Sequence, residues 1–150
     1  MIVSGSISDF ISLTKPRVVI LLQITAICSV IIHDMTGSGL NMASFRTMIL
    51  VLIGGYLTAG GANAINMWYD RDIDPNMSRT SKRPIPQGRI SSKSALIFGV
   101  LVSISGVAWF YIMTNSVAAF WSAFSILFYV VIYSMWLKRS TPQNIVIGGI

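Results

Sequence analysis

The chain has 150 residues, of which 53% are hydrophobic and 11% are charged, and its 11 Lys and Arg residues outnumber 5 acidic residues, all of them Asp. An average soluble domain has roughly 25% charged residues, so this composition excludes an ordinary soluble protein as well as a disordered chain. The single cysteine, Cys28, excludes an intrachain disulfide and a cysteine-based zinc site. We therefore expect membrane lipid around the chain and no nucleic-acid partner.

Long apolar segments follow one another along the chain and predict an all-α, polytopic transmembrane helical bundle. A helix of about 20 apolar residues crosses a bilayer. The spans are expected at about 11–33, 47–69, 95–113 and 117–137, with the start of a fifth at 144–150. The first span includes a kink at Pro16. Its basic flank is also typical of a signal peptide, but no small-x-small cleavage site follows it.

Basic and non-basic connections between these spans alternate along the chain, so that nearly all basic residues lie on one side. Six basic residues lie in the connection 70–93, Lys15 and Arg17 flank the apolar part of the first span on its N-terminal side, and Lys138 and Arg139 follow the fourth span. Only Arg46 lies on the other side. The positive-inside rule therefore predicts that the N-terminus and the loop 70–93 are cytoplasmic. Because no Arg- and Ser-rich presequence is present, a bacterial inner membrane fits better than an organelle.

Three oxygen-bearing side chains, Asn66, Asp70 and Asp74, are spaced four residues apart at the end of the second span. On a continuous helix they lie on one face, with successive Cα atoms about 6 Å apart, and Pro75 is expected to end the helix near Asp74. Carboxylates in this position are costly unless they face a polar cavity or a partner. Since Mg²⁺ binds one or two carboxylates together with substrate phosphates, these residues are candidate metal ligands and catalytic residues.

A basic run, Arg79, Lys82 and Arg83, follows within nine residues of Asp74 and offers hydrogen-bond donors to phosphate oxygens. The acidic stripe and the basic run together predict a clamp for a metal-bound diphosphate in the loop 70–93. The alternative interpretation is that such bases set the topology or touch anionic lipids. We favour that alternative for Arg89 and Lys93.

The second span is also rich in small residues, which permit close helix packing or a cavity beside the backbone. They are Gly54, Gly55, Ala59, Gly60, Gly61, Ala62 and Ala64. Asn63 and Asn66 in the same stretch favour a polar pocket next to the clamp, because an amide that faces lipid lacks partners. After the span, Arg71 and Asp72 could form a local ion pair of little energetic value.

Several phrases of the sequence resemble a known family. Asn66-x3-Asp70-x3-Asp74, followed by Arg79-Thr80 and Arg83-Pro84, resembles the first aspartate-rich motif of the UbiA-type intramembrane prenyltransferases. Longer segments of the sequence are similar to the heme-farnesylating members of this family. These segments are LTKPRV at 13–18, NMWYDRDID at 66–74, RTSKRPIPQGRIS at 79–91 and YSMWLKRSTPQNIVIGG at 133–149.

This resemblance implies a reaction that requires Mg²⁺, in which a farnesyl group passes from farnesyl diphosphate to a vinyl group of heme B to give heme O. By the same resemblance, the magnesium ligands would be Asn66, Asp70 and Asp74. The residues that contact the diphosphate would be Arg79, Lys82, Arg83 and Lys138. The resemblance also implies that the protein could associate with a heme A synthase or with terminal oxidase assembly.

Members of this family are about twice as long, with about nine spans and a second aspartate-rich motif that binds another Mg²⁺. No acidic residue follows Asp74 here, so we expect this chain to correspond to the N-terminal half, a truncated form that binds diphosphate weakly by itself. The only histidine, His33, lies at the opposite end of the first span from the clamp and is not expected to bind heme iron.

Two rival functions remain open at this point. The first is a prenyltransferase with an aromatic acceptor, as in quinone biosynthesis, because the aspartate stripe does not distinguish acceptors. The second is a non-catalytic membrane protein, either an assembly factor or a cation-pathway subunit in which Asn66 and Asp70 line a path. Competition between heme B and an aromatic acceptor distinguishes the first rival from heme farnesylation. The second rival predicts that Asp70→Asn alters transport or assembly but leaves prenyl transfer unaffected.

Overall fold

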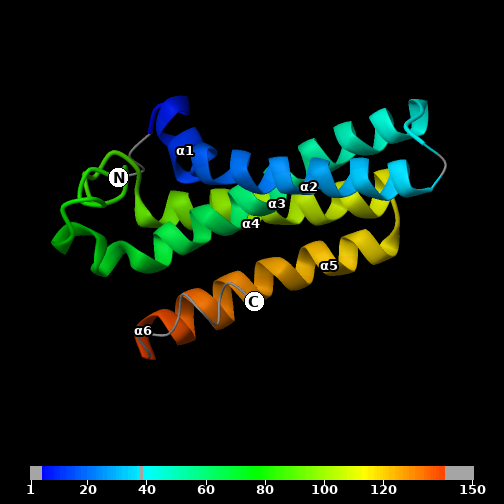
Figure 1. Ribbon diagram of the computed structural model, residues 1–150. Coiled ribbons are helices and arrows are strands. Elements are labelled where there is room, and N and C mark those ends of the chain that lie inside the picture. Colours follow the sequence, from blue (N-terminus) through cyan, green and yellow to red (C-terminus); the bar gives the residue numbers. More distant parts are fainter. Residues whose placement is uncertain (1–4, 38, 141–150) are drawn as a thin grey trace.

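The computed structural model describes residues 5–37 and 39–140, and the regular elements within these ranges are all helical (Figure 1). Four helical segments are long and apolar enough to cross a membrane. They are Pro16–Thr36, Met42–Asp72, Ser92–Met113 and Ser116–Ser140. The prediction of an all-α, polytopic transmembrane bundle with four spans is confirmed. The predicted start of a fifth span at 144–150 lies outside the described residues.

The N-terminal segment forms two helices rather than one kinked span beginning near residue 11. Helix α1 (Ile7–Leu13) ends before Lys15, and α2 (Pro16–Thr36) has Pro16 at its first position. Proline suits this position because its missing N–H is not needed there, and it disfavours helical backbone at the residue before it. Lys15 accordingly has a φ of 52°, in the left-handed region. This break directs the Lys15 side chain to the C-terminal end of the third helix.

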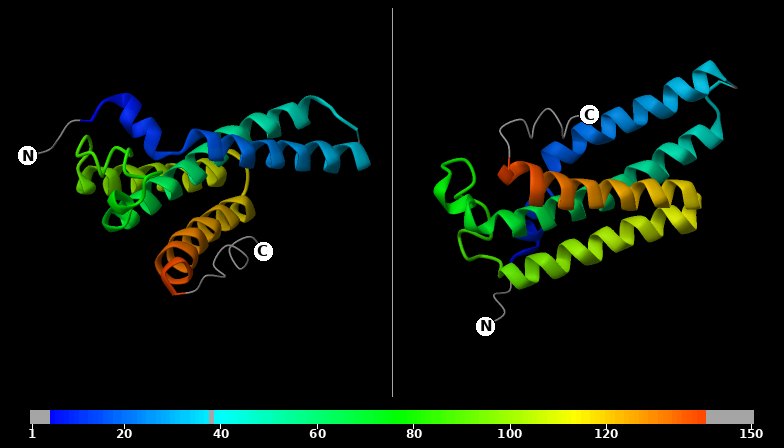
Figure 2. Two further views of the ribbon diagram at one scale, coloured as in Figure 1. Left: turned by 60° about the vertical axis from the view of Figure 1, so that its left-hand side comes forward. Right: turned by 90° about the horizontal axis from the view of Figure 1, so that it is seen from below.

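Helix α3 (Met42–Tyr69) is the central element and packs against α2, α4 and the C-terminal helices (Figures 1 and 2). Asn41 caps its start by accepting hydrogen bonds from the backbone N–H groups of Ala43 and Ser44, at 2.8 and 3.2 Å. Its 28 residues span about 42 Å, which exceeds a hydrocarbon core of about 30 Å. The residues from Gly60 to Met67 are all buried. The end of α3 is therefore enclosed by protein rather than by lipid.

Helix α4 (Ser92–Met113) runs back along α3, and a short turn at Thr114–Asn115 leads to α5 (Ser116–Leu127). The last span continues without a break through η3 (Phe128–Leu137), which is a π-helix, and α6 (Lys138–Ser140). This rod packs against α4 and α3 through α5, and its C-terminal part, η3, also contacts α3 (Figure 2). Lys138 thus reaches the same end of the molecule as Lys15.

The outer faces of the spans carry large apolar side chains. At least half of each of the following is exposed: Ile20, Leu21, Ile24, Ile49, Leu101, Ile104, Phe120 and Trp121. Such a surface suits lipid tails and not water. Figure 1 shows the connection between α2 and α3 at one end of the bundle and the connection between α3 and α4 at the other, so the alternation of basic and non-basic connections corresponds to two distinct ends.

Helices α3 and α4 lie so close together that a side chain would not fit between them at several glycines. A Cβ on Gly61 would lie 2.6 Å from the backbone nitrogen of Ser103 and 2.9 Å from the carbonyl oxygen of Gly99. Small residues at such contacts allow the van der Waals packing that drives helix association in membranes. Other small residues of α3, including Gly55 and Ala59, line a cavity instead. The small-residue stretch therefore provides both close packing and a cavity.

Gly61→Ala should destabilise the bundle by about 1–3 kcal/mol, because the new methyl group overlaps backbone that cannot move aside easily. Gly55→Ala is the matched control on the same helix, since its Cβ would meet only the flexible amide of Gln23, at 3.0 and 3.1 Å. Unfolding in mixed micelles with increasing sodium dodecyl sulfate measures both variants. Equal effects from the two substitutions would show that close packing at Gly61 is not what matters.

Candidate functional site

Asn66, Asp70 and Asp74 are buried together at the end of α3, with 3%, 0% and 1% of each residue exposed. The α-helix ends at Tyr69, earlier than the sequence predicts. Asp70 begins a 3-10 turn, η1 (Asp70–Asp72), and Asp74 begins a second one, η2 (Asp74–Asn76). Pro75 follows Asp74 and has no N–H for helical hydrogen bonding, so the chain turns back at this point. The α-helix therefore ends about one turn before the position near Asp74 that the sequence predicts, and the three side chains are all enclosed.

Each of these three side chains has a cationic partner from a different part of the chain. Lys15 Nζ donates to Asn66 Oδ1 at 2.8 Å, and Lys138 Nζ donates to Asp70 Oδ2. Arg83 Nη1 donates to both oxygens of Asp74, at 2.9 and 2.7 Å. We call these six residues the acid–base cluster: Lys15, Asn66, Asp70, Asp74, Arg83 and Lys138.

The cluster holds three cations and two carboxylates, so its net charge is positive. Burial lowers the pKa of Lys15 to about 8, and the nearby charges of Arg83 and Lys138 lower it too, while Asp70 and Asp74 oppose the shift. At neutral pH most Lys15 side chains therefore still carry their proton. One oxygen, Asp70 Oδ1, is buried and has no hydrogen-bond partner among residues 5–37 and 39–140. A buried anionic oxygen left in this state is costly unless something else binds to it.

The donor set fits a small, hard cation. Mg²⁺ prefers oxygen ligands and commonly takes only one or two carboxylates from the protein. Asp70, Asp74 and the amide oxygen of Asn66 supply such ligands. Among the described residues, none forms a hydrogen bond with Asp70 Oδ1, so this oxygen is available to a cation. Within residues 5–37 and 39–140, no three His, Cys or acidic side chains form a group that could hold a metal. A bound ion would therefore need further ligands, such as phosphate oxygens or water.

The loop after η2 is packed against the helices rather than being a loose connection. Thr80 Oγ1 donates to the carbonyl oxygen of Asp74 at 2.9 Å, and Thr80 itself is only 1% exposed. Ile85 and Ile90 join a core with Leu13, Ala64 and Met67. Arg89, which the sequence suggests is a topology or lipid contact, instead pairs with Asp9 of α1. These contacts hold Arg83 in place against Asp74.

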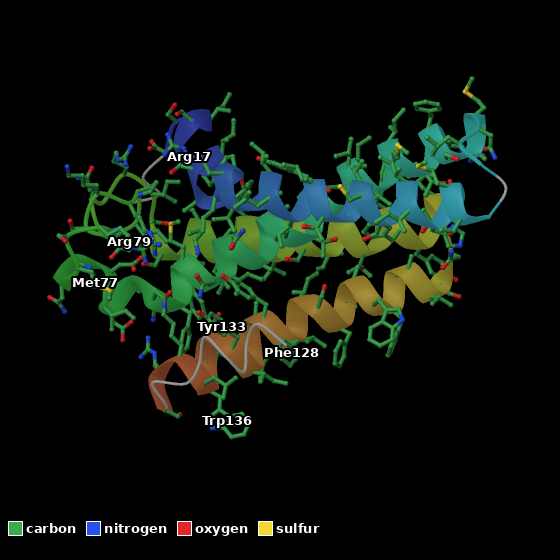
Figure 3. All side chains as sticks on the ribbon, viewed as in Figure 1. Arg17, Met77, Arg79, Phe128, Tyr133 and Trp136 are labelled. Carbon is green, nitrogen blue, oxygen red and sulfur yellow. The ribbon has the colours of Figure 1, made fainter. Side chains whose placement is uncertain are left out.

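Two residues of the predicted basic run do not join the cluster. Arg79 and Lys82 are exposed, and their side chains make no hydrogen bond or ion pair with the described part of the chain. Figure 3 shows Arg79 in the loop that forms the end of the molecule, close to Met77. Of the basic side chains assigned to a diphosphate, Arg83 and Lys138 are the two that the fold brings to the aspartates.

The local pair between Arg71 and Asp72 is also wrong. Asp72 pairs with Arg139, whose nitrogens donate to its two oxygens at 2.7 and 2.9 Å, and the Arg139 guanidinium lies 4.4 Å from the centre of the Tyr69 ring. Arg71 instead lies over the Trp68 ring and donates to the Trp68 carbonyl oxygen. The 3-10 turn at η1 changes the direction of Asp72 from the one that a helix would give it.

Two residues of the site are missed by the sequence reasoning. Lys15 is counted there only as a topology signal, although its position directly before Pro16 indicates an unusual backbone. Ser134, which is fully buried, accepts a hydrogen bond from Asn66 Nδ2 at 2.9 Å, and nothing in its local sequence indicates this. By contrast, Trp136 on the same helix points away from the bundle and is 63% exposed (Figure 3).

A cavity of about 630 Å³ lies among α2, α3, α4 and the rod of α5 and η3. Most of its wall is apolar, but Asn63 and Tyr129 both line it, and the Tyr129 hydroxyl donates to Asn63 Oδ1 at 3.3 Å. Asn63 lies one helical turn before Asn66 of the acid–base cluster. Of the two asparagines expected to line a polar pocket, Asn63 lines this mostly apolar cavity, whereas Asn66 is not among its lining residues.

The fold and the site define a multi-pass membrane protein with a buried, positively charged polar cluster at one end of its central helix and an apolar cavity nearby. The family model of the UbiA prenyltransferase family matches residues 22–150. The chain belongs to this family.

Several bacterial relatives are similar over nearly the whole chain, and each is named protoheme IX farnesyltransferase. The Bartonella tribocorum protein is 50% identical over 97% of this chain, and the Bartonella henselae protein is 48% identical over 96%. The Chloroflexus aurantiacus protein is 48% identical over 95%. The matched region covers 45%, 44% and 24% of these proteins, so the chain spans less than half the length of these curated relatives. No solved structure matches the chain significantly.

Arg83→Met should destabilise the protein by about 3–5 kcal/mol, because it leaves the buried Asp74 carboxylate without its partner. Arg139→Met is the control. It removes a pair with Asp72 at the surface, where the side chain of Asp72 is 55% exposed, and should cost much less stability than Arg83→Met. Unfolding in mixed micelles measures both. If adding Asp74→Asn to Arg83→Met restores no stability, the loss does not arise from an unpaired charge.

Proposed function

We propose that the protein transfers a farnesyl group from farnesyl diphosphate to a vinyl group of heme B, producing heme O. The acid–base cluster would bind the diphosphate together with Mg²⁺. The observation that carries this proposal is the burial of Asp70 amid Lys15, Arg83 and Lys138, with one carboxylate oxygen that lacks a hydrogen-bond partner in the described part of the chain. Farnesyl transfer to protoheme is supported by the names of the bacterial relatives, which match about 96% of this chain.

Binding would exchange the ion pairs of the cluster. In the structure Lys138 and Arg83 occupy oxygens of Asp70 and Asp74. An incoming diphosphate offers both cations stronger, more highly charged acceptors. If Lys138 and Arg83 moved to the phosphate oxygens, Asp70 and Asp74 would be free to bind Mg²⁺. The diphosphate would supply the remaining ligands of the metal at the same time. The metal and the diphosphate would therefore bind together rather than independently.

The residues of the cluster would then stabilise the leaving group. Mg²⁺, when bound, supplies charge that favours departure of the pyrophosphate. Arg83 and Lys138 would hold the phosphate oxygens as negative charge develops on them. The C1–O bond of the farnesyl group breaks with both electrons on the pyrophosphate. A C–C bond then forms from C1 to the terminal vinyl carbon of heme B, and water adds to the adjacent carbon with loss of a proton.

The cavity beside the cluster would hold the farnesyl chain. Its volume of about 630 Å³ and its mostly apolar wall suit an isoprenoid tail, and its enclosure in a membrane keeps water from the allylic cation. Asn63 and Tyr129 line it, and Asn63 lies one turn from Asn66, so the diphosphate end of the substrate would face the cluster. Arg79 and Lys82 would contact only the part of the substrate that remains outside.

We further propose that the protein resides in a bacterial inner membrane, with its N-terminus and the loop 70–93 on the cytoplasmic side. The distribution of its basic residues supports this orientation. Water-soluble diphosphate then reaches the cluster from the cytoplasm. Association with a heme A synthase or with terminal oxidase assembly fits the same role, because those steps would consume heme O.

Asp70→Asn should abolish heme O formation, because it removes a buried carboxylate that would hold the metal. The assay is extraction of hemes from a strain that lacks its own synthase and expresses the protein in the longest form its gene encodes. Lys93→Met, an exposed residue outside the cluster, is the control and should leave heme O unchanged. Prenylation of a hydroxybenzoate in preference to heme B would instead favour a prenyltransferase with an aromatic acceptor, as in quinone biosynthesis. Cation transport that depends on Asp70, without prenyl transfer, would favour the non-catalytic one.

Lys138→Met should raise the affinity for Mn²⁺, used in place of Mg²⁺, by about tenfold when no pyrophosphate is present, because it frees an oxygen of Asp70 from a competing cation. The same substitution should reduce the extra affinity that inorganic pyrophosphate confers on Mn²⁺. Electron paramagnetic resonance of free Mn²⁺ measures both quantities for the purified chain in lipid nanodiscs. A lower Mn²⁺ affinity in the variant without pyrophosphate would contradict the ion exchange.

A further inference from the structure

The π-helix η3 places the Ser134 hydroxyl between two partners. Ser134 Oγ donates to the carbonyl oxygen of Tyr129, five residues earlier, at 2.8 Å, and accepts a hydrogen bond from Asn66 Nδ2 at 2.9 Å. In the regular helix α4 the comparable Ser105 donates to Leu101, only four residues earlier. The wider turn of η3 thus decides where the Ser134 hydroxyl points. Such turns are rare and are frequently found at functional sites.

A serine hydroxyl carries one hydrogen, and Ser134 uses it on the Tyr129 carbonyl. Toward Asn66 the hydroxyl therefore presents lone pairs only. These lone pairs accept from an amide nitrogen but repel an amide oxygen, so the Nδ2 end of Asn66 has to face Ser134. The Oδ1 end is then held on the opposite side, where it accepts from Lys15 Nζ at 2.8 Å.

This orientation matters because the two ends of an asparagine amide are alike in size but opposite in function. Only Oδ1 can bind a cation, whereas Nδ2 carries two hydrogens and repels one. Lys15 also favours the observed orientation, but a metal at Oδ1 would take the place of Lys15. Of these two partners, Ser134 is the one that would then still hold the Asn66 amide.

We infer that Ser134 is a positioning residue of the metal site, which holds the amide of Asn66 with its oxygen toward the cation. This inference rests on the proposed function, because it assigns Asn66 as a metal ligand. Hydrogen-bond partners of metal ligands usually orient the ligand, and their loss typically lowers metal affinity about 10–100-fold. Ser134 belongs to a span separated from Asn66 by 68 residues, so it connects the last helix to the metal site.

Ser134→Ala should lower the affinity for Mn²⁺ in the presence of inorganic pyrophosphate about tenfold. The same substitution made in the Asn66→Asp background should change the affinity less than twofold, because both ends of an aspartate are oxygens and need no orientation. Ser103→Ala is the matched control, since Ser103 is a buried serine of α4 whose hydroxyl has no hydrogen-bond partner among the residues that the structure describes. It should leave the affinity unchanged. Electron paramagnetic resonance of the chain in nanodiscs measures the unsubstituted protein and each of these variants, including Asn66→Asp alone.

A second measurement follows the hydrogen bond without any metal. In the chain labelled with ¹⁵N-asparagine, the side-chain amide hydrogens of Asn66 should exchange slowly with water and at least tenfold faster after Ser134→Ala. Equal exchange in the two proteins would overturn the inference. An equal loss of Mn²⁺ affinity in the Asn66 and Asn66→Asp backgrounds would also overturn it, because Ser134 would then act only through packing. Failure of the unsubstituted chain to bind Mn²⁺ with pyrophosphate would instead refute the proposed metal site.

Discussion

Two carboxylates buried at the end of a membrane-crossing helix cannot remain charged there without nearby cations. Asp70 and Asp74 are both almost completely enclosed, and the energetic cost of burying a charge is several kcal/mol unless it is paired. The surrounding fold brings cations from three directions, of which Arg83 and Lys138 pair with the carboxylates and Lys15 bonds to the neighbouring Asn66. The break before α2 brings Lys15, the packed loop brings Arg83, and the return of the last span brings Lys138. These distant segments are thus fixed at one end of α3 by electrostatics as well as by packing.

The sequence predicts the membrane spans and the buried polar residues better than it predicts which side chains contact one another. Four apolar spans follow from length and hydropathy alone, because a bilayer allows few alternatives to helices. The spacing of Asn66, Asp70 and Asp74 also predicts that their side chains form a candidate site at the end of the second span. The structure buries all three there. Whether they hold a metal stays a prediction.

The partners of these residues depend on backbone details that spacing does not reveal. Lys15 reaches Asn66 only because its left-handed backbone separates α1 from α2. Asp72 meets Arg139 because a 3-10 turn replaces the last helical turn that the sequence predicts. Ser134 meets Asn66 through a π-helix, although its residues would suit an ordinary apolar α-helix. Each of these contacts joins segments more than 50 residues apart, so no local pattern encodes it.

The charge of the cluster bears on what it would bind. With three cations and two carboxylates, it has an excess of positive charge, which disfavours a free divalent cation and favours an anion. A diphosphate that brings one Mg²⁺ still carries negative charge, so it complements the cluster as a unit. Arg83 and Lys138, which stabilise the fold by pairing with Asp74 and Asp70, would thereby exclude the metal until the diphosphate arrives. Stability without substrate and selectivity for a metal-bound diphosphate would then have a single electrostatic origin.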